Sequence, residues 1–401
     1  MTEPVTEAVS VTERAAERIA LEGVGKSYPG SGAPALRDIT LSVEPGTFLV
    51  LLGPSGSGKT TLLRCLAGIE RVSAGRISIG GVTVADGAVH VPPEKRELSM
   101  VFQDYALWPH LTAAQNVAFA LRRRRVGRAA GRQRAEAMLR RVGLAALADR
   151  YPNQLSGGEQ QRVALARALV AGTGLILCDE PLSNLDADLR ERLRVEIAEL
   201  VRDSGATTVY ITHDQAEAFA LADRVGVLEH GALVQLGPPE EIYTRPASPF
   251  VARFTGLSGE LTVATAPAPV PGMVDIAPAG PAWAAPLRVP ATAAVPGGGT
   301  ALLMIRPTGV ALSYDPGGEQ HLTGIVADAA FRGRGYEHAV DIPGHGRLAG
   351  VLGPRRAPRG SRVGLRLDAA GCHLFPVPGE TAIAAAAGTG PAAAAGQSRP
   401  P

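Results

Sequence analysis

The chain has 401 residues, of which 45% are hydrophobic, and its formal net charge is only +2. This length suits two or three globular domains, and the balanced charge excludes the global basic field expected of a protein that binds nucleic acid or anionic lipid through charge alone. The three cysteines, Cys65, Cys178 and Cys372, lie far apart and in no metal-ligand spacing, which indicates a reducing compartment without disulfides.

Residues 1–18 are predicted to be a polar tail, and their acidic composition does not fit a signal peptide. No window approaches eighteen consecutive apolar residues, so we expect that the chain does not itself span a membrane. From residue 19 to about 237 short apolar runs alternate with helical patterns, which is typical of an α/β domain with a largely parallel sheet. Four runs are near-continuously apolar, as in strands covered on both faces: FLVLLG (48–53), LSMVFQ (98–103), LILCDE (175–180) and TVYIT (208–212).

A phosphate-binding loop is predicted between the first of these strands and the helical pattern TLLRCLAG. Residues 53–60, GPSGSGKT, fit the pattern G-x-x-x-x-G-K-[ST], in which loop N–H groups surround a β-phosphate. Lys59 would reach the β- and γ-phosphate oxygens, and the Thr60 hydroxyl would ligate Mg²⁺. Only three of the 40 Lys and Arg residues are lysines, and the compact charge that this loop needs explains one of them. The predicted nucleotide-binding residues here are Gly53, Pro54, Ser55, Gly56, Ser57, Gly58, Lys59, Thr60 and Thr61.

Residues 104–172 contain no strand-like run and are predicted to form a helical insert between two strands. Arginine is abundant in residues 122–141, starting with RRRRVGR. We expect a solvated helix face and loop, with phospholipid head groups as an alternative partner, because polybasic segments are attracted to anionic surfaces. Nucleic acid is disfavoured, since no aromatic residues are interleaved with these arginines.

A second anion-binding pattern lies inside the insert. LSGGEQQR, residues 155–162, leads directly into the apolar-periodic segment VALARALVAG. Ser156, Gly157 and Gly158 therefore predict a helix start, where backbone N–H groups favour an anion.

Two carboxylates end the strand LILCDE. Asp179 and Glu180 lie at the carboxyl end of a buried strand, where open α/β sheets bind ligands. Because adjacent strand residues face opposite ways, the two side chains are predicted to have different roles. We expect Asp179 to face Mg²⁺ and Glu180 to face the attacking water.

After residue 250 the sequence changes from alternating strand and helix patterns to short β-like segments. Residues 225–237 predict a hairpin that turns at His230 and Gly231, and the Pro-rich segment 237–250 marks a boundary. Short β-like segments then predict a small barrel or sandwich: LLMIRP, GIVADAAF, HAVDI, VGLRLD and HLFPV. Residues 267–286 fit a linker equally well, and residues 378–401 are low in complexity and expected to be disordered.

With these motifs in place, residues 19–250 resemble the nucleotide-binding subunit of an ABC transporter. GPSGSGKT resembles a Walker A motif, LILCDE a Walker B motif followed by a general-base Glu, and LSGGEQQR the ABC signature. The resemblance implies a P-loop NTPase of the ABC ATPase fold that binds ATP and Mg²⁺. It also implies roles for four further residues: Gln103 in the Q-loop (catalysis and Mg²⁺), Asp186 of SNLDA in the D-loop, His213 of ITHD (catalysis), and Tyr28 of VGKSYPG, which would stack on adenine.

The same resemblance implies partners. Two copies would form a head-to-tail homodimer, and hydrolysis would open it. A separate integral-membrane permease would dock on the helical insert near Gln103, at the cytoplasmic face of the membrane, and an extracytoplasmic solute-binding protein would act through it. The residues implied to contact the partner's ATP are Ser156, Gly157, Gly158, Gln160 and Asp186.

Residues 256–377 resemble the OB-like TOBE domain of importers in the maltose, polyamine, iron and sulfate group, through MIRP (304–307), GIVADAAFRGRGYEHAV (324–340) and HLF (373–375). Ser258 departs from that group, which commonly has Asn near this position. The implied function is an ATP-hydrolysing subunit that energises solute import, with iron(III), polyamine or phosphonate as candidate substrates. The alternative is a soluble ABC ATPase acting on DNA or the ribosome; such proteins usually carry two cassettes or long coiled-coil insertions, and neither occurs in this sequence.

Overall fold

The computed structural model describes residues 15–122, 126–277, 282–290, 295, 298–315 and 321–377. The chain divides into two compact units, the first ending at Ile242 and the second beginning at Tyr243. The predicted tail 378–401, most of the predicted tail 1–18 and residues 123–125 of the Arg-rich segment lie outside the described residues. In the described ranges no helix is both long enough and apolar enough to cross a membrane.

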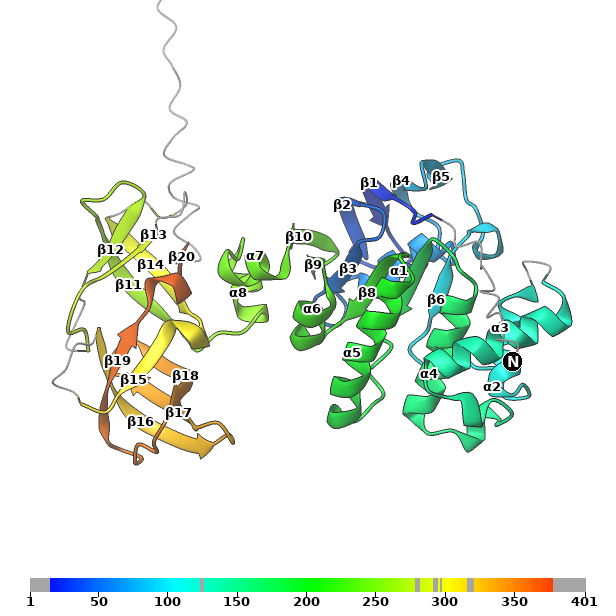
Figure 1. Cartoon of the computed structure of the whole chain (residues 1–401). Coiled ribbons are helices and arrows are strands. Elements are labelled where there is room, and N and C mark those ends of the chain that lie inside the picture. The colour runs from blue at the N-terminus through cyan, green and yellow to red at the C-terminus, as the bar shows by residue number, and fades with distance from the viewer. Residues whose placement is uncertain are drawn as a thin grey trace, which may run out of the picture. The chain divides into compact units, whose positions relative to one another are not determined.

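A six-stranded sheet forms the centre of the first unit, in the order β10-β9-β3-β8-β7-β6 (Figure 1). All neighbours are parallel except β10, which returns antiparallel to β9. The four predicted strands and the hairpin are therefore confirmed. The turn has φ 46° at His230 and φ 80° at Gly231, as a type I′ turn requires. The strands are β3 (Phe48–Leu52), β6 (Ser99–Val101), β7 (Leu175–Asp179), β8 (Thr207–Thr212), β9 (Arg224–Glu229) and β10 (Ala232–Gly237).

A second sheet, antiparallel and not predicted from the sequence, has the order β2-β1-β4-β5. Its buried residues share one core with helix α1 and with alternate residues of the parallel strands, among them Leu49, Leu51 and Leu177. In Figure 1 its blue strands and the green helices α5 and α6 lie on opposite sides of the parallel sheet. Its strands are β1 (Ile19–Lys26), β2 (Leu36–Val43), β4 (Ala74–Ile79) and β5 (Val82–Ala85).

The helical insert between β6 and β7 is confirmed for the described residues. Its helices α2, α3 and α4 enclose a core of their own that includes Val117, Leu139 and Val163. In α3 the buried residues Gly131, Ala135 and Leu139 follow each other at four-residue spacing, so the arginines occupy the other faces. The helices of the first unit are α1 (Lys59–Ala67), α2 (Ala113–Phe119), α3 (Arg128–Arg141), α4 (Gly157–Val170), α5 (Ala187–Asp203), α6 (Gln215–Leu221) and α7 (Pro239–Thr244), which crosses the boundary.

The second unit is a small all-β domain preceded by α8 (Pro249–Phe254), as predicted. Two antiparallel five-stranded sheets, β13-β12-β11-β14-β20 and β15-β19-β16-β17-β18, share one core. The described part of residues 267–286 is no linker, because it contains β12, and Trp283 bridges to Leu322. The strands are β11 (Gly259–Pro267), β12 (Met273–Ala277), β13 (Leu287–Pro290), β14 (Gly299–Ile305), β15 (Val310–Ser313), β16 (Leu322–Phe331), β17 (Tyr336–Ile342), β18 (Gly346–Gly353), β19 (Arg362–Leu367) and β20 (Cys372–Pro376).

Candidate functional site

The loop between β3 and α1 presents backbone N–H groups to an anion. Gly58 precedes α1 with φ 100° and supplies no side-chain cap, so the first-turn N–H groups of α1 keep their hydrogen-bonding capacity. A Cβ atom on Gly58 would lie 2.6 Å from the carbonyl oxygen of Ala35, so only glycine fits there. Orphan N–H groups and the positive end of the helix dipole together favour phosphate at this position.

Lys59 places its ammonium group inside this loop. Its Nζ donates to the carbonyl oxygens of Gly53 at 2.7 Å and Pro54 at 3.0 Å. Burial lowers the pKa of Lys59, and the carboxylates of Glu180 and Asp179 partly offset that effect. The nearby Ser57 Oγ is buried and has no hydrogen-bond partner among the described residues. The loop therefore has a cation and a hydroxyl whose hydrogen-bonding capacity phosphate oxygens can satisfy.

Thr60, in the first turn of α1, and Asp179, at the end of β7, bring a hydroxyl and a carboxylate close together. Thr60 Oγ1 lies 3.5 Å from Asp179 Oδ1, at the carboxyl end of β7. Burial raises the pKa of Asp179, and the positive charge of Arg64 lowers it. A hydroxyl beside a partly desolvated carboxylate offers the oxygen donors that Mg²⁺ prefers, so these two residues would hold that ion. No cluster of three or more His, Cys, Asp or Glu side chains able to hold a metal occurs in the described part of the chain.

Glu180 has a left-handed backbone, with φ 42°. Our expectation that the strand pleat separates Asp179 from Glu180 was wrong, because β7 ends at Asp179 and the turn at Glu180 sets the direction of its side chain. Such a conformation costs on the order of 1–2 kcal/mol in a non-glycine residue and persists where the surroundings hold it. Ser183 holds it here, since its N–H and its hydroxyl both donate to the Glu180 carbonyl, at 3.2 and 2.9 Å.

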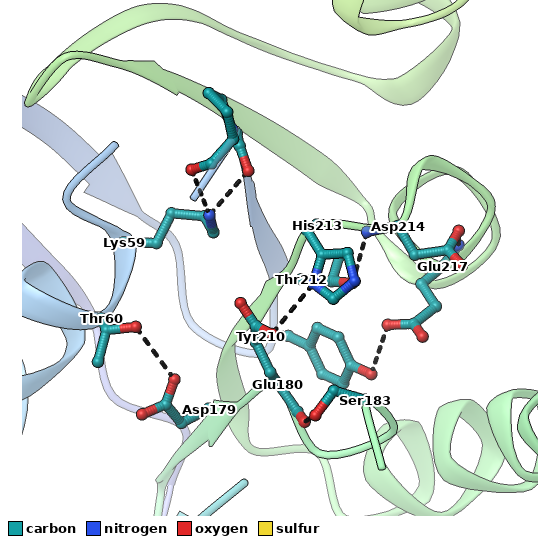
Figure 2. Close-up of polar contacts among 12 residues, drawn as sticks. Lys59, Thr60, Asp179, Glu180, Ser183, Tyr210, Thr212, His213, Asp214 and Glu217 are labelled. Atoms are coloured by element: carbon teal, nitrogen blue, oxygen red, sulfur yellow. Dashed lines mark hydrogen bonds and ion pairs between the residues drawn. The ribbon is translucent and has the colours of Figure 1, made fainter. Parts of the chain in front are cut away.

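His213 joins this cluster from the end of β8. Its Nδ1 lies 3.0 Å from Glu180 Oε2, and Figure 2 shows the pair on the side of the site opposite Thr60. Asp214, the next residue, caps α6 by accepting from the Ala216 N–H at 2.7 Å. The predicted residues Lys59, Thr60, Asp179, Glu180 and His213 are thus brought to one edge of the parallel sheet.

The sequence did not predict a buried hydrogen-bonded pair, Tyr210 and Glu217, close to His213 in the chain. The hydroxyl of Tyr210 donates to Glu217 Oε2 at 3.0 Å, linking β8 to the first turn of α6. Burial raises the pKa of both groups. The only signal in the sequence was a tyrosine within an otherwise aliphatic and threonine-containing strand.

The predicted Q-loop and D-loop are joined by Asn184, a contact that the sequence did not indicate. Asn184 donates its side-chain amide to the Gln103 carbonyl at 2.9 Å. Gln103 itself follows β6, and its side chain is exposed. Asp186 caps α5 by accepting from the Leu189 N–H at 2.9 Å. The structure therefore connects the two loops within one chain.

The predicted helix start at Ser156 is confirmed. Ser156 accepts from the Glu159 N–H at 3.4 Å and donates its own N–H to Glu159 Oε2 at 2.7 Å, which is a capping box. Gly158 is packed so closely that a Cβ atom would lie 2.8 Å from the Leu189 side chain. Gln160 donates its amide to carbonyl oxygens of the preceding turn at 2.9 and 3.1 Å, so it stabilises the signature turn of its own chain.

Tyr28 lies in the turn after β1. Its carbonyl accepts from the N–H and the hydroxyl of Ser31, at 3.2 and 2.8 Å. The Nζ of Lys26 lies 4.7 Å from the centroid of the Tyr28 ring, so a cation covers one ring face.

Comparison with known proteins gives two family matches. Residues 36–183 match the ABC transporter family, and residues 303–375 match the TOBE domain. The phosphate loop and both carboxylates at the end of β7 lie within the first match.

Curated relatives match most of the chain. The Fe(3+) ions import ATP-binding protein FbpC of Rhizobium etli is 44% identical over 323 residues, which is 80% of this chain and 87% of the relative. The protein of the same name from Brucella abortus is 44% identical over 330 residues, 82% of this chain and 89% of the relative. The trehalose/maltose import ATP-binding protein MalK of Thermococcus litoralis is 50% identical over 224 residues, 55% of this chain and 60% of the relative.

A solved structure matches about half of this chain. It is a dimeric ATP-binding cassette in a post-hydrolysis state, bound to ADP and Pi. It is 32% identical to this chain with a TM-score of 0.50, and the match covers 55% of this chain and 98% of the cassette.

Proposed function

Because this chain belongs to the ABC transporter family and is an ATPase that energises solute import, we propose that its cargo is ferric iron and that it works as a homodimer on a separate membrane permease. Ferric iron is favoured because the relatives that match four-fifths of the chain are named for Fe(3+) import.

The observation that carries the proposed chemistry is the meeting of five side chains at the carboxyl edge of the parallel sheet. Lys59 and the loop N–H groups hold the β- and γ-phosphates of ATP, and Tyr28 stacks on its base. Glu180 accepts the proton of the attacking water while that water's oxygen bonds to the γ-phosphorus and the bond to ADP breaks. His213 orients Glu180 and contacts the γ-phosphate. Thr60, Asp179 and Gln103 would hold Mg²⁺, which would supply charge neutralisation on the phosphates.

We assign the signature turn to the ATP of a second copy. The start of α4 belongs to the helical insert, which has its own core. Its N–H groups and helix dipole favour the γ-phosphate of a facing copy through Ser156, Gly157 and Gly158. Gln160 supports this turn, and Asp186 lies beside it in the interface. Loss of the γ-phosphate on hydrolysis removes this link, and the dimer opens. The dimeric state of the solved cassette supports this arrangement.

We place the permease in a groove of about 940 Å³ between β6 and the insert helices α2 and α4. Its apolar lining includes Met100, Phe102 and Leu107. At its rim Trp108 and Phe119 are 45% and 39% exposed, with ring centroids 5.6 Å apart. Exposed aromatics around an apolar groove are typical of protein docking sites, and a short amphipathic helix fits such a shape. The chain would then lie on the cytoplasmic face of the membrane, with the solute-binding protein acting through the permease.

The cargo is tested by reconstitution in liposomes with the permease and solute-binding protein of the same import system. We expect the binding protein loaded with iron(III) to stimulate ATP hydrolysis, whereas polyamine, phosphonate and maltose leave it at the basal rate. Glu180→Gln in the same complex is the control and should remove the stimulated rate. Equal activity with every solute overturns the assignment of iron.

A further inference from the structure

Lys26, the last residue of β1, makes three contacts with its ammonium group. Nζ lies 2.8 Å from Glu70 Oε2, donates to the Arg71 carbonyl at 2.9 Å, and lies 4.7 Å from the centroid of the Tyr28 ring. Only 11% of the Lys26 side chain is exposed. An ammonium group has three N–H donors, and a carboxylate, a carbonyl and a ring face supply three partners for them.

This geometry explains why lysine occurs at position 26 of a chain in which only three of the 40 Lys and Arg residues are lysines. Arginine spreads its donors over a planar fork suited to carboxylate or phosphate. It cannot direct three donors from one nitrogen toward partners that lie in three directions. Lys59 in the phosphate loop meets a comparable need, because there too a compact point charge is required.

The contacts of Lys26 connect Tyr28 to the far end of the phosphate-loop helix. Glu70 and Arg71 follow α1, and this turn is fixed to the helix because the N–H groups of Ile69 and Glu70 donate to the Arg64 carbonyl at 2.9 and 3.2 Å. The other end of α1 begins at Lys59. One helix therefore carries the phosphate-binding residues at its start and the anchor of Lys26 just past its end.

We propose that Lys26 is a positioning residue for the nucleotide base. It fixes the position of the Tyr28 ring relative to α1. The residues that bind the base and those that bind the phosphates are then connected through this one helix. The ammonium occupies one face of the ring and draws π-electron density toward itself, which leaves the opposite face to stack on an electron-rich purine. This inference rests on the proposed function, in which Tyr28 stacks on the base.

The experiment compares a ligand that has a base with one that lacks it. Isothermal titration calorimetry measures the Kd of Mg-ADP and of inorganic tripolyphosphate for the full chain and for Lys26→Met. We expect ADP to bind about fivefold more weakly to the variant, the loss typical of a partly buried cation–π contact, and tripolyphosphate to bind unchanged. Lys95→Met is the matched control, since Lys95 is exposed on a one-turn helix, Pro93–Lys95, and should leave both constants unchanged.

A double-mutant cycle with Tyr28→Leu separates positioning from a general structural role. If Lys26 acts through the ring, Lys26→Met causes no further loss of ADP affinity in the Tyr28→Leu background. An unchanged ADP affinity in Lys26→Met, an equal loss for tripolyphosphate, or additive losses in the double variant each overturn the proposal. Failure of the wild-type chain to bind either ligand would instead contradict the proposed function.

Glu70→Gln keeps the test decisive if Lys26→Met does not fold. This variant retains the Lys26 ammonium group but weakens its ion pair with residue 70, whose side chain is partly exposed. We expect a smaller loss of ADP affinity with tripolyphosphate again unchanged. Equal losses for the two ligands would show that this cluster acts on α1 as a whole and not on the ring.

Discussion

The Nδ1 atom of His213 lies 3.0 Å from Oε2 of Glu180, and the two residues follow adjacent parallel strands, β8 and β7. In the tautomer with its proton on Nδ1, the imidazole of His213 donates to this carboxylate. Ser183 holds the backbone of Glu180 in its left-handed turn, and His213 holds its side chain. The carboxylate is therefore fixed from two sides before any substrate contacts it.

Replacing His213 by Ala should lower kcat strongly, by a factor on the order of 10²–10⁴, because an undirected Glu180 no longer meets the attacking water in a productive geometry. Affinity for Mg-ADP should change little, since the loop around Lys59 is intact. Steady-state ATPase assays and calorimetry measure the two quantities. His110→Ala, at an exposed position in the insert, is the control. Unchanged turnover in His213→Ala would reduce His213 to a structural residue.

Glu180→Gln should bind ATP, fail to hydrolyse it and accumulate as a dimer. The amide keeps the shape of the side chain but cannot take a proton from water, so the γ-phosphate that links two copies remains in place. Light scattering on the variant with and without Mg-ATP measures its mass. Adding Lys59→Ala to the same variant should abolish the dimer by preventing ATP binding. A variant that binds ATP yet stays monomeric at every concentration contradicts the role of the signature turn in a second copy.

The sequence was sufficient for those parts of the site that depend on local order along the chain. The positions of Lys59 and Thr60 follow from the fixed spacing of a buried strand, a glycine-rich loop and a helix. The position of Asp179 follows from a continuous apolar run that ends in acidic residues. The parallel sheet follows from the same runs, because strands covered on both faces leave an unmistakable apolar pattern.

Contacts between distant segments were not predictable in the same way. Lys26 and Glu70 are 44 positions apart, and their pairing depends on how β1 lies beside the end of α1. The left-handed turn at Glu180 could not be predicted from sequence patterns, because a positive φ is expected mainly at glycine or asparagine. The antiparallel sheet was also missed, because β1, β2 and β4 bury only part of their residues and carry bulges or register shifts that interrupt their alternation.

Arg96→Met should lower the free energy of unfolding of the first unit by about 3–5 kcal/mol, because it removes a buried cation that satisfies backbone acceptors. Arg96 is only 2% exposed, and it donates to the carbonyls of Cys65 and Leu66 at the end of α1, at 2.7 and 2.6 Å. Burial lowers its pKa to about 10, so it remains charged at neutral pH. Urea denaturation measures the loss. Arg76→Met, in an exposed pair with Glu22, is the control and should stay within about 0.5 kcal/mol of wild type.

The second unit should lose stability as the pH falls from about 6.5 to about 4. Burial, with the charge of Arg306 as the smaller cause, lowers the pKa of His373 to about 4. Between this value and the ordinary 6.5, the unfolded chain binds a proton that the folded chain does not, so acid favours unfolding. The slope is at most about 1.4 kcal/mol per pH unit, and partial exposure of the ring narrows the pH range over which this slope applies.

His373→Gln should flatten this pH dependence. The measurement uses urea denaturation of the full chain carrying Trp108→Phe, so that the fluorescence of Trp283 alone reports on the second unit. At pH 7 the pH dependence of the two proteins should differ much less than at pH 5, because at the higher pH His373 is neutral in the folded chain and mostly neutral in the unfolded chain. A His373→Gln protein with the same acid sensitivity as its parent contradicts the assignment.

Asp179→Asn should stabilise the chain without ligands while removing its response to Mg²⁺. Burial raises the pKa of Asp179, so folding at neutral pH carries the cost of a partly desolvated carboxylate. For an acid with a raised folded-state pKa, stability falls as the pH rises from 3.8 through that raised value. Asparagine keeps an oxygen near Thr60 without the charge, so the free energy of unfolding should rise at neutral pH.

The same variant should bind ATP as well in EDTA as in Mg²⁺ and should hydrolyse it far more slowly, because a neutral amide is a poor ligand for a hard dication. Thermal unfolding and calorimetric titration across a range of Mg²⁺ concentrations measure both effects. Asp86→Asn is a control of opposite sign, since the Asp86 carboxylate accepts from the N–H groups of Ala88 and Val89, which lower its pKa. Lower stability in Asp179→Asn would contradict the burial cost, and a retained Mg²⁺ response would remove Asp179 from the metal site.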